Sequence, residues 1–396
     1  SAAAFATGVA FESPTAGALL APVAAGVAYS RLHTGAHWLS DVVGGVALGA
    51  AVAGAGRLLD PHLVPRHRIG GQGDAIELPA SATGEGVFIV SNGRSGRHVH
   101  RRDPLRIIAR RLPDATLRVL GRGETVDGVI RAALNGPRPP RVLGVCGGDG
   151  TVSAVAHVAR KAGLPLLVLP AGTFNHFARA AGAETVDAGI DALQAGRGLR
   201  VDVAEAAVDD GDPITVLNAV ATGLYPDFLA ERDKDEDRLT KWGASLTAAA
   251  RLGRRLRPVE IRLAGRRTTA WSLFVSVDRN DPRLVSTMQR RGLTDRVLDV
   301  RILHVGGSRI RAVASLIFGK RISAVLRAVG LMPPQSRVES FTAKVLRLSV
   351  RTDRDGPPRL SHDGELEEAP AGRAAEFRIE VRIAARGLDV YSLGPR

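Results

Sequence analysis

Two glycine-rich turns in the first half of the chain have residue types suited to binding a phosphate group. They are Cys146-Gly147-Gly148-Asp149-Gly150-Thr151 and Pro170-Ala171-Gly172-Thr173-Phe174-Asn175-His176-Phe177-Ala178. Glycines let backbone N–H groups approach an anion closely, and a following helix N-terminus attracts negative charge. The Asp149 carboxylate can reach a magnesium ion, and Thr151 can cap a helix or contact phosphate oxygens. The two turns therefore predict a nucleotide phosphate site.

Apolar runs and helical segments are expected to position these turns. Runs 141–146 and 164–169 predict neighbouring parallel strands, and 152–161 predicts the helix between them. Both turns should then open at the carboxyl ends of their strands, where open α/β sheets bind ligands. The run 87–90 ends in a third small-residue turn, Ser91-Asn92-Gly93-Arg94-Ser95-Gly96. Such turns also occur in ordinary α/β domains for structural reasons alone.

In this order the turns resemble those of the diacylglycerol kinase catalytic-domain family, lipid kinases that include bacterial lipid kinases and sphingosine kinases. The family's GGDGT and PxGTxNxFA motifs are intact, and its Asn-Pro-x-Ser-Gly turn has Gly93 in place of proline. Leu217–Leu224 resembles the family's apolar-Asn-apolar-Gly segment. The resemblance implies ATP and Mg²⁺ as cofactors, with ATP bound by Asn92, Ser95, Gly96, Gly147, Gly148, Asp149, Gly150, Thr151, Gly172, Thr173 and Asn175.

The same resemblance implies catalytic roles for three carboxylates. Asp363-Gly364-Glu365 stands where the family has an Asp-Gly-Glu triplet, so Asp363 is expected to be the general base with Glu365 beside it, and Asp149 completes the catalytic set. An Asp-Gly pair is also a common hairpin turn, which is the structural alternative. For Asn175, a cap or turn role is as plausible as contact with phosphate or ribose.

A second metal site is expected at Asp295. The segment 293–300 resembles the family's Asp-Gly-Leu-Leu-Asp segment, where some members hold a magnesium ion that links the lobes. In this chain Arg296 replaces the glycine, and a surface carboxylate is the alternative for Asp295. The segment 277–281 departs from the family's small-residue pattern, so lipid selectivity cannot be carried over.

The fold class expected is α/β, with a three-layer α/β nucleotide-binding domain and a β-rich, sandwich-like second domain. Recurrent β-like runs after residue 200 support this order of classes. They are 259–263, 270–277, 297–304, 343–350 and 375–383, with helices expected at 238–256 and 308–329. The expected boundaries are a helical membrane remnant at 1–60, a linker at 61–85, the nucleotide-binding domain at 86–200 and the second domain at 201–396.

The N-terminal segment 30–41 resembles the last signature of the type 2 phosphatidic acid phosphatase (PAP2) family. The resemblance implies phosphate contacts for Ser30 and Arg31, a nucleophilic His37 and an orienting Asp41. Histidine and aspartate four residues apart share one helix face, as an oriented nucleophile requires. The family's upstream Lys/Arg-Pro and Pro-Ser-Gly-His segments do not precede Ser1. We therefore expect a fragment of a longer protein in which this remnant is inactive.

Two uncharged segments surround that signature, at 13–30 and 42–56. Both are alanine- and glycine-rich and fit helices packed within a membrane bundle, and the second is shorter than the roughly 20 residues that a span requires. A buried soluble hairpin is the alternative. A cleaved signal peptide is disfavoured because no basic region precedes the first apolar run.

The chain has 54 basic and 40 acidic residues, a net charge of +14. Arginine clusters at 97–111, 251–267 and 290–327 favour an acidic membrane surface as a partner. Only 4% of residues are aromatic and no nucleic-acid-binding motif occurs, so specific nucleic-acid recognition is excluded. Cys146 is the single cysteine, which excludes disulfides within the chain. A homodimer is left open.

These observations predict an ATP-dependent kinase for a lipid hydroxyl, with diacylglycerol, a sphingoid base, a polyprenol or a related lipid as acceptor. The protein is expected to be membrane-associated, with its catalytic domain in the cytoplasm. One alternative is a NAD kinase-like enzyme, since NAD kinase shares the GGDGT turn. The other is a nucleotide-binding lipid sensor without catalysis, against which the intact Asp149 and Asp363 argue.

Overall fold

The computed structural model divides the chain into two compact units, Ser1–Arg68 and Ile69–Arg396. In the first unit it describes only Pro22, Gly26 and Tyr29, each helical. In the second unit it describes residues 73–92, 103–172, 175–209, 211–234, 241–280, 290, 292–306, 308–317, 333–352, 358–367 and 376–394. Within these residues no helix is long and apolar enough to cross a membrane. The expected membrane remnant at 1–60 lies almost wholly outside them.

Helices and strands alternate in the first part of the second unit, and strands predominate in the rest of it. The described helices are α4 (Pro104–Arg111), α5 (Val126–Leu134), α6 (Asp149–Ala162), α7 (His176–Ala180), α8 (Val186–Ala195), α9 (Leu224–Asp233), α10 (Lys241–Arg255), α11 (Arg309–Ile317) and the 3₁₀ turn η1 (Gln335–Arg337). The described strands are β1 (Asp74–Glu77), β2 (Val87–Ser91), β3 (Thr116–Val119), β4 (Val142–Gly147), β5 (Leu166–Pro170), β6 (Arg197–Val208), β7 (Ile214–Val216), β8 (Ala219–Gly223), β9 (Val259–Leu263), β10 (Arg266–Val277), β11 (Leu298–His304), β12 (Val338–Ala343), β13 (Val345–Arg351), β14 (Leu360–His362), β15 (Glu365–Leu366) and β16 (Glu376–Tyr391).

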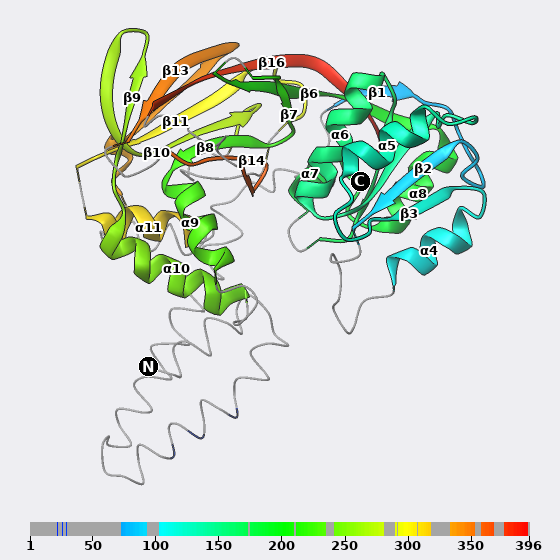
Figure 1. Ribbon diagram of the computed structural model, residues 1–396, viewed down its shortest axis with the longest axis horizontal. Helices are drawn as coiled ribbons and strands as arrows, with labels where there is room; N and C mark the ends of the chain where they lie inside the picture. Colours follow the sequence, from blue (N-terminus) through cyan, green and yellow to red (C-terminus); the bar gives the residue numbers. More distant parts are fainter. Residues whose placement is uncertain are drawn as a thin grey trace, which may run out of the picture. The chain divides into compact units, whose positions relative to one another are not determined.

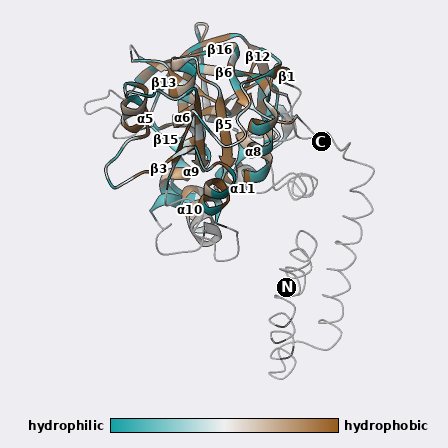
Figure 2. Ribbon diagram, turned by 90° about the vertical axis from the view of Figure 1, so that its right-hand side faces the viewer, coloured by the Kyte–Doolittle hydropathy of each residue, from teal (hydrophilic) through white to brown (hydrophobic). Residues whose placement is uncertain are grey.

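The first lobe is built on a parallel sheet in the order β5-β4-β2-β3. Every residue of β4 and β5 is buried, as expected for apolar runs in the centre of a parallel sheet covered on both sides. Helices α5 and α6 pack on one face through Ile130 and Val155, and α4 and α8 pack on the other through Ile108 and Ile190 (Figure 1). Strand β5 is strongly hydrophobic in Figure 2.

The second lobe is antiparallel and β-rich. Strands β8, β9 and β11 pair with β10, and β13 pairs with β9 and β16. Val220, Val275 and Val300 from β8, β10 and β11 share a core with Val381 of β16 and Ala206 of β6. Helices α9, α10 and α11 form a separate apolar cluster with the end of this sheet, which leaves one side of α10 and α11 exposed.

Two long strands join the lobes. The first half of β6 has Leu199 and Val201 in the core of the first lobe, and its second half has Ala206 in the core of the second. Strand β16 pairs with β13 and then reaches the first lobe, where Val390 pairs in parallel with Leu166 of β5. The last part of β16, with Val390 and Tyr391, therefore packs in the first lobe, although most of the chain just before it belongs to the second lobe.

The predicted order of a parallel α/β region followed by an antiparallel β-rich region is confirmed. The run 259–263 coincides with β9, and the other β-like runs overlap β10, β11, β13 and β16. The expected linker at 61–85 needs a correction, because Asp74–Glu77 forms strand β1 and pairs with Arg197–Arg200 of β6. Of the helix expected at 308–329, Arg309–Ile317 is helical and 318–332 lies outside the described residues.

A histidine contact between the lobes makes stability depend on pH. The His157 Nδ1 atom on α6 accepts a hydrogen bond from the Thr215 backbone N–H on β7, at 3.1 Å. Burial lowers the pKa of His157 below its ordinary value of 6.5, so the unfolded chain binds this proton more readily than the folded one. The unfolding free energy should therefore fall as the pH drops below about 6.5.

Denaturant unfolding at about pH 7.5 and about pH 5.5 measures this effect. His157→Gln should show a smaller fall on acidification than the wild type, since glutamine does not titrate. An equal fall in both proteins would assign the pH dependence to other groups.

Candidate functional site

The two phosphate-loop candidates touch each other at the carboxyl ends of β4 and β5. The Ala171 N–H donates to the Gly147 carbonyl over 3.0 Å. A Cβ at Gly172 would lie only 2.5 Å from the Gly148 Cα, so the backbones approach more closely than any side chain allows. A Cβ at Gly147 would lie 2.9 Å from the Cβ of Thr151. Glycine is thus required at these positions by the close contact between the loops and with Thr151.

Asn175 closes the second loop. Its Oδ1 atom accepts from the Gly172 N–H and its Nδ2 atom donates to the Gly172 carbonyl, each over 3.0 Å. The residue has φ 51°, a left-handed conformation that asparagine tolerates better than most residues. Both atoms of the amide are used within the loop, which supports the turn-forming role for Asn175. Thr173 lies outside the described residues.

Asp149 begins α6 and connects the two loops. Its carboxylate accepts hydrogen bonds from the backbone N–H groups of His176 and Phe177 at the start of α7. Burial raises the pKa of Asp149, and the nearby His176 and these N–H groups oppose the rise. The Oδ1 atom is buried and has no hydrogen-bond partner within the described part of the chain. This vacant acceptor beside the loops fits a magnesium ion held together with nucleotide phosphates.

Asp363 and Gly364 form the turn of a hairpin between β14 and β15. Their φ angles of 49° and 90° match a type I′ turn, which favours aspartate followed by glycine. The turn places the Glu365 side chain against the N-terminal turn of α6, where a Cβ on Gly150 would lie 2.0 Å from a Glu365 carboxylate oxygen. The hairpin alternative is therefore correct as a description of the backbone, and it brings both carboxylates of the triplet to the GGDGT loop.

The Asp363 carboxylate is buried and accepts four hydrogen bonds. Oδ1 receives the backbone N–H groups of Asn218 and Ala219 at 2.6 and 3.2 Å. Oδ2 receives the Leu217 N–H at 2.9 Å and the Ser153 hydroxyl at 2.6 Å. Ser153 lies on α6, Leu217 and Asn218 precede β8, and Ala219 begins β8, so this one carboxylate joins the two lobes. A carboxylate has about four acceptor positions, and all of them are used.

Tyr225 forms part of the wall beside these carboxylates. Burial, with Asp149, Asp363 and Glu365 nearby, raises its pKa to about 12 against the opposing charge of Arg232. Its ring meets that of Phe274 edge-on, with centroids 5.8 Å apart. The phenol is therefore neutral at physiological pH.

Asp295, where a second metal site was expected, lies at the surface. The side chain is exposed, and its Oδ2 atom accepts the backbone N–H of Arg279 at 3.0 Å. Among the residues that the structure describes, no three histidine, cysteine or acidic side chains gather to hold a metal ion. The surface alternative for Asp295 is therefore the one that the geometry supports.

The remaining site predictions are only partly covered by the structure. Asn92 is half-buried and directly follows β2, and its contact with ATP stays a prediction. Ser95 and Gly96 of the same turn, and the PAP2-like Ser30, Arg31, His37 and Asp41, lie outside the described residues. Ser153 and Tyr225 were missed because nothing in the local sequence marks them. Ser153 becomes visible only through a hydrogen bond that spans 210 positions.

Comparison with known proteins identifies two family segments. Residues 86–206 match the diacylglycerol kinase catalytic domain, and residues 1–61 match the PAP2 superfamily. The chain thus carries a catalytic domain of the diacylglycerol kinase family preceded by a PAP2-family segment.

Solved structures similar to this chain include two from one bacterium. One diacylglycerol kinase from Bacillus anthracis str. Sterne is 17% identical with a TM-score of 0.47, and the alignment covers 77% of this chain and 96% of that one. A second protein from the same organism, assigned as a diacylglycerol kinase, is 16% identical with a TM-score of 0.49, covering 79% of this chain and 99% of that one.

Proposed function

We propose that this protein transfers the γ-phosphoryl group of ATP to a hydroxyl group of a lipid. The observation that carries the proposal is the hydrogen bond between Ser153 and Asp363. It holds a carboxylate of the second lobe beside α6, the helix that begins at the GGDGT loop. Phosphoryl transfer needs positioning and charge neutralisation more than covalent chemistry, and this arrangement supplies a base next to a phosphate site.

In the proposed reaction, Asp363 takes the proton of the lipid hydroxyl at Oδ2. Three of its four hydrogen bonds come from backbone N–H groups, whose direction is fixed. The fourth comes from the Ser153 hydroxyl, which can rotate and so free Oδ2 for the proton, or can itself accept a hydrogen bond. The lipid oxygen bonds to the γ-phosphorus as the bond to the ADP oxygen breaks. The backbone of the GGDGT loop and the N-terminus of α6 hold the phosphates in line. A magnesium ion at Asp149 would neutralise charge on the transferred group.

The direct test uses the full chain with Mg²⁺, labelled ATP and a mixed lipid extract, followed by separation of the products. A labelled lipid supports the proposal and names the acceptor among diacylglycerol, sphingoid bases, polyprenols and related lipids. Label on NAD alone would replace it with the NAD kinase alternative. ATP binding without transfer to any lipid would favour the sensor.

We further propose that the second lobe meets an acidic membrane surface at the cytoplasmic face. The support is an arginine-rich face on α10 and α11, defined by Arg251, Arg254, Arg255, Arg309 and Arg311. All five are exposed and surround Ile310, whose side chain is 69% exposed. Neither helix contains an acidic residue, and Arg251 is paired with Glu231 of α9 at 3.9 Å, so the positive charge of this face comes mainly from the other four arginines. Arginine around an exposed apolar side chain suits anionic headgroups above an acyl layer.

Replacing Arg254, Arg255 and Arg311 with glutamine should weaken binding to acidic vesicles by about a hundredfold, since each basic residue contributes on the order of 1 kcal/mol. Co-sedimentation at low and high salt measures the salt-sensitive part of the affinity. The control removes three exposed arginines from the first lobe, Arg110, Arg122 and Arg138. Equal losses of vesicle affinity in the two variants would mean that binding depends on the net charge of the protein and not on this face.

A further inference from the structure

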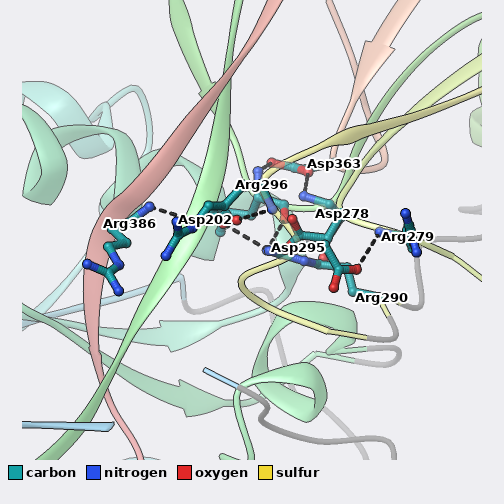
Figure 3. A network of polar contacts seen from close by, with 10 residues as sticks. Asp202, Asp278, Arg279, Arg290, Asp295, Arg296, Asp363 and Arg386 are labelled. Carbon is teal, nitrogen blue, oxygen red and sulfur yellow. Dashed lines mark hydrogen bonds and ion pairs between the residues drawn. The ribbon is translucent and has the colours of Figure 1, made fainter. Parts of the chain in front are cut away.

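Arg290 places a buried positive charge where the two lobes meet. Its side chain is fully buried and forms an ion pair with the equally buried Asp278 (Figure 3). Its guanidinium also donates to two main-chain carbonyls, that of Leu217 at 2.8 Å and that of Asp202 at 2.9 Å. A buried charge is tolerated only when it is paired and hydrogen-bonded, and these three oxygens provide that environment.

One of the three partners of Arg290, Asp202, lies on a strand that joins the lobes. Asp202 lies at the middle of β6, and its own carboxylate accepts the backbone N–H groups of Arg296 and Arg386, each at 2.7 Å. Arg386 lies in the bulge where β16 passes between the lobes. By binding the Asp202 and Leu217 carbonyls, the guanidinium connects the middle of β6, beside the β16 bulge, to the turn before β8.

That turn is the one that holds the candidate base. Arg290 binds the Leu217 carbonyl, while the Leu217 N–H donates to Asp363. The next two N–H groups, of Asn218 and Ala219, also donate to Asp363. Fixing the carbonyl of this short segment fixes the direction of the three N–H groups, and through them the carboxylate. Arg290 thus acts on Asp363 through Leu217 and positions this carboxylate indirectly.

We propose that Arg290 is a built-in cation that takes the place of a lobe-linking metal ion and positions Asp363. One carboxylate and two carbonyl oxygens are the donor set that a hard divalent cation would use, and in this protein a guanidinium occupies it. Asp295, where that metal was expected, is exposed, and its Oδ2 atom accepts the Arg279 N–H. The positioning role rests on the proposed lipid kinase function, whereas the metal-independent link between the lobes does not.

Thermal unfolding of the full chain tests the link. Wild-type Tm should be unchanged by EDTA or by added Mg²⁺ in the absence of nucleotide. Arg290→Ala should melt about 10 °C lower, as expected for loss of one partner of a buried pair in a domain of this size. Low millimolar guanidinium chloride should raise the Tm of Arg290→Ala relative to equal sodium chloride, and should leave the wild type unchanged. Arg279→Ala, a change at a neighbouring exposed arginine, is the matched control and should melt like the wild type.

A wild-type Tm that falls with EDTA and recovers with Mg²⁺ would overturn the proposal, as would an Arg290→Ala protein that melts like the wild type. If Arg290→Ala does not fold, Arg290→Lys is measured instead. Lysine keeps the charge but lacks the planar set of donors of arginine, so this variant should fold and melt below the wild type.

The positioning role is tested by measuring the kinetics of Arg290→Lys at a temperature where this variant is folded. Its kcat for lipid phosphorylation should fall about tenfold while the KM for ATP stays within about twofold, since the nucleotide loops are untouched. Equal kcat values would reject positioning. A wild type that phosphorylates no lipid would reject the proposed function and leave the Tm result standing.

Discussion

Replacing Asp363 with asparagine is expected to lower kcat for lipid phosphorylation by about 100-fold to 10,000-fold, the range that a positioned general base contributes. Asparagine has nearly the same shape and tolerates the left-handed conformation at φ 49°, so the hairpin should persist. Its NH₂ group can accept neither a proton nor the N–H groups that now point at the carboxylate. Unpaired buried donors should also lower the unfolding free energy by about 1–3 kcal/mol. Parallel kinetic and denaturant measurements check both effects.

Two companion variants separate chemistry from folding. Ser153→Ala removes the only rotatable donor to Asp363 and keeps the carboxylate and its three N–H bonds. Glu365→Gln changes an exposed carboxylate and should leave stability unaltered. If Asp363→Asn phosphorylates lipid at the wild-type rate, Asp363 has no part in proton transfer and only organises the junction of the lobes.

The sequence could predict the parts of the site that lie within one turn. The GGDGT loop follows a fully buried strand and starts α6, as its apolar run and glycines predicted. The Asp-Gly pair at 363–364 predicted a hairpin, and the hairpin is present. In both cases the residue types themselves dictate the backbone, because glycine and aspartate accept conformations that other residues avoid.

Contacts between distant segments could not be predicted in this way. Arg290 belongs to a segment expected to meet membranes, yet it is buried against a carbonyl 73 positions away. Strand β1 was expected to be linker because glycine and proline surround it, and it is a strand because β6 offers it an edge. The acceptor lipid and a homodimer stay predictions for a related reason, since each depends on surfaces that no local pattern defines.

Replacing Gly172 with alanine is expected to weaken ATP binding by at least about tenfold, equivalent to about 1.4 kcal/mol. The added Cβ would lie 2.5 Å from the Gly148 Cα and 2.8 Å from the Asn175 Oδ1. Neither atom can yield locally, because one is backbone and the other is held by the hydrogen bond that closes the loop. The two loops must therefore separate, and a displacement of about 1 Å is enough to misplace bound phosphates.

Titration with a fluorescent ATP analogue measures this loss, and Gly253→Ala provides the control. Gly253 lies inside α10, and its added Cβ would meet nothing closer than the Ile310 Cγ1 at 3.7 Å. That change should leave ATP affinity unaltered and slightly stabilise the helix, by roughly 0.5–1 kcal/mol. Wild-type affinity in Gly172→Ala would mean that the loops bind nucleotide independently of their contact. If only Gly172→Ala loses affinity, nucleotide binding depends on the close contact between the loops that follow β4 and β5. Ser153 contacts Asp363 at this same end of the sheet.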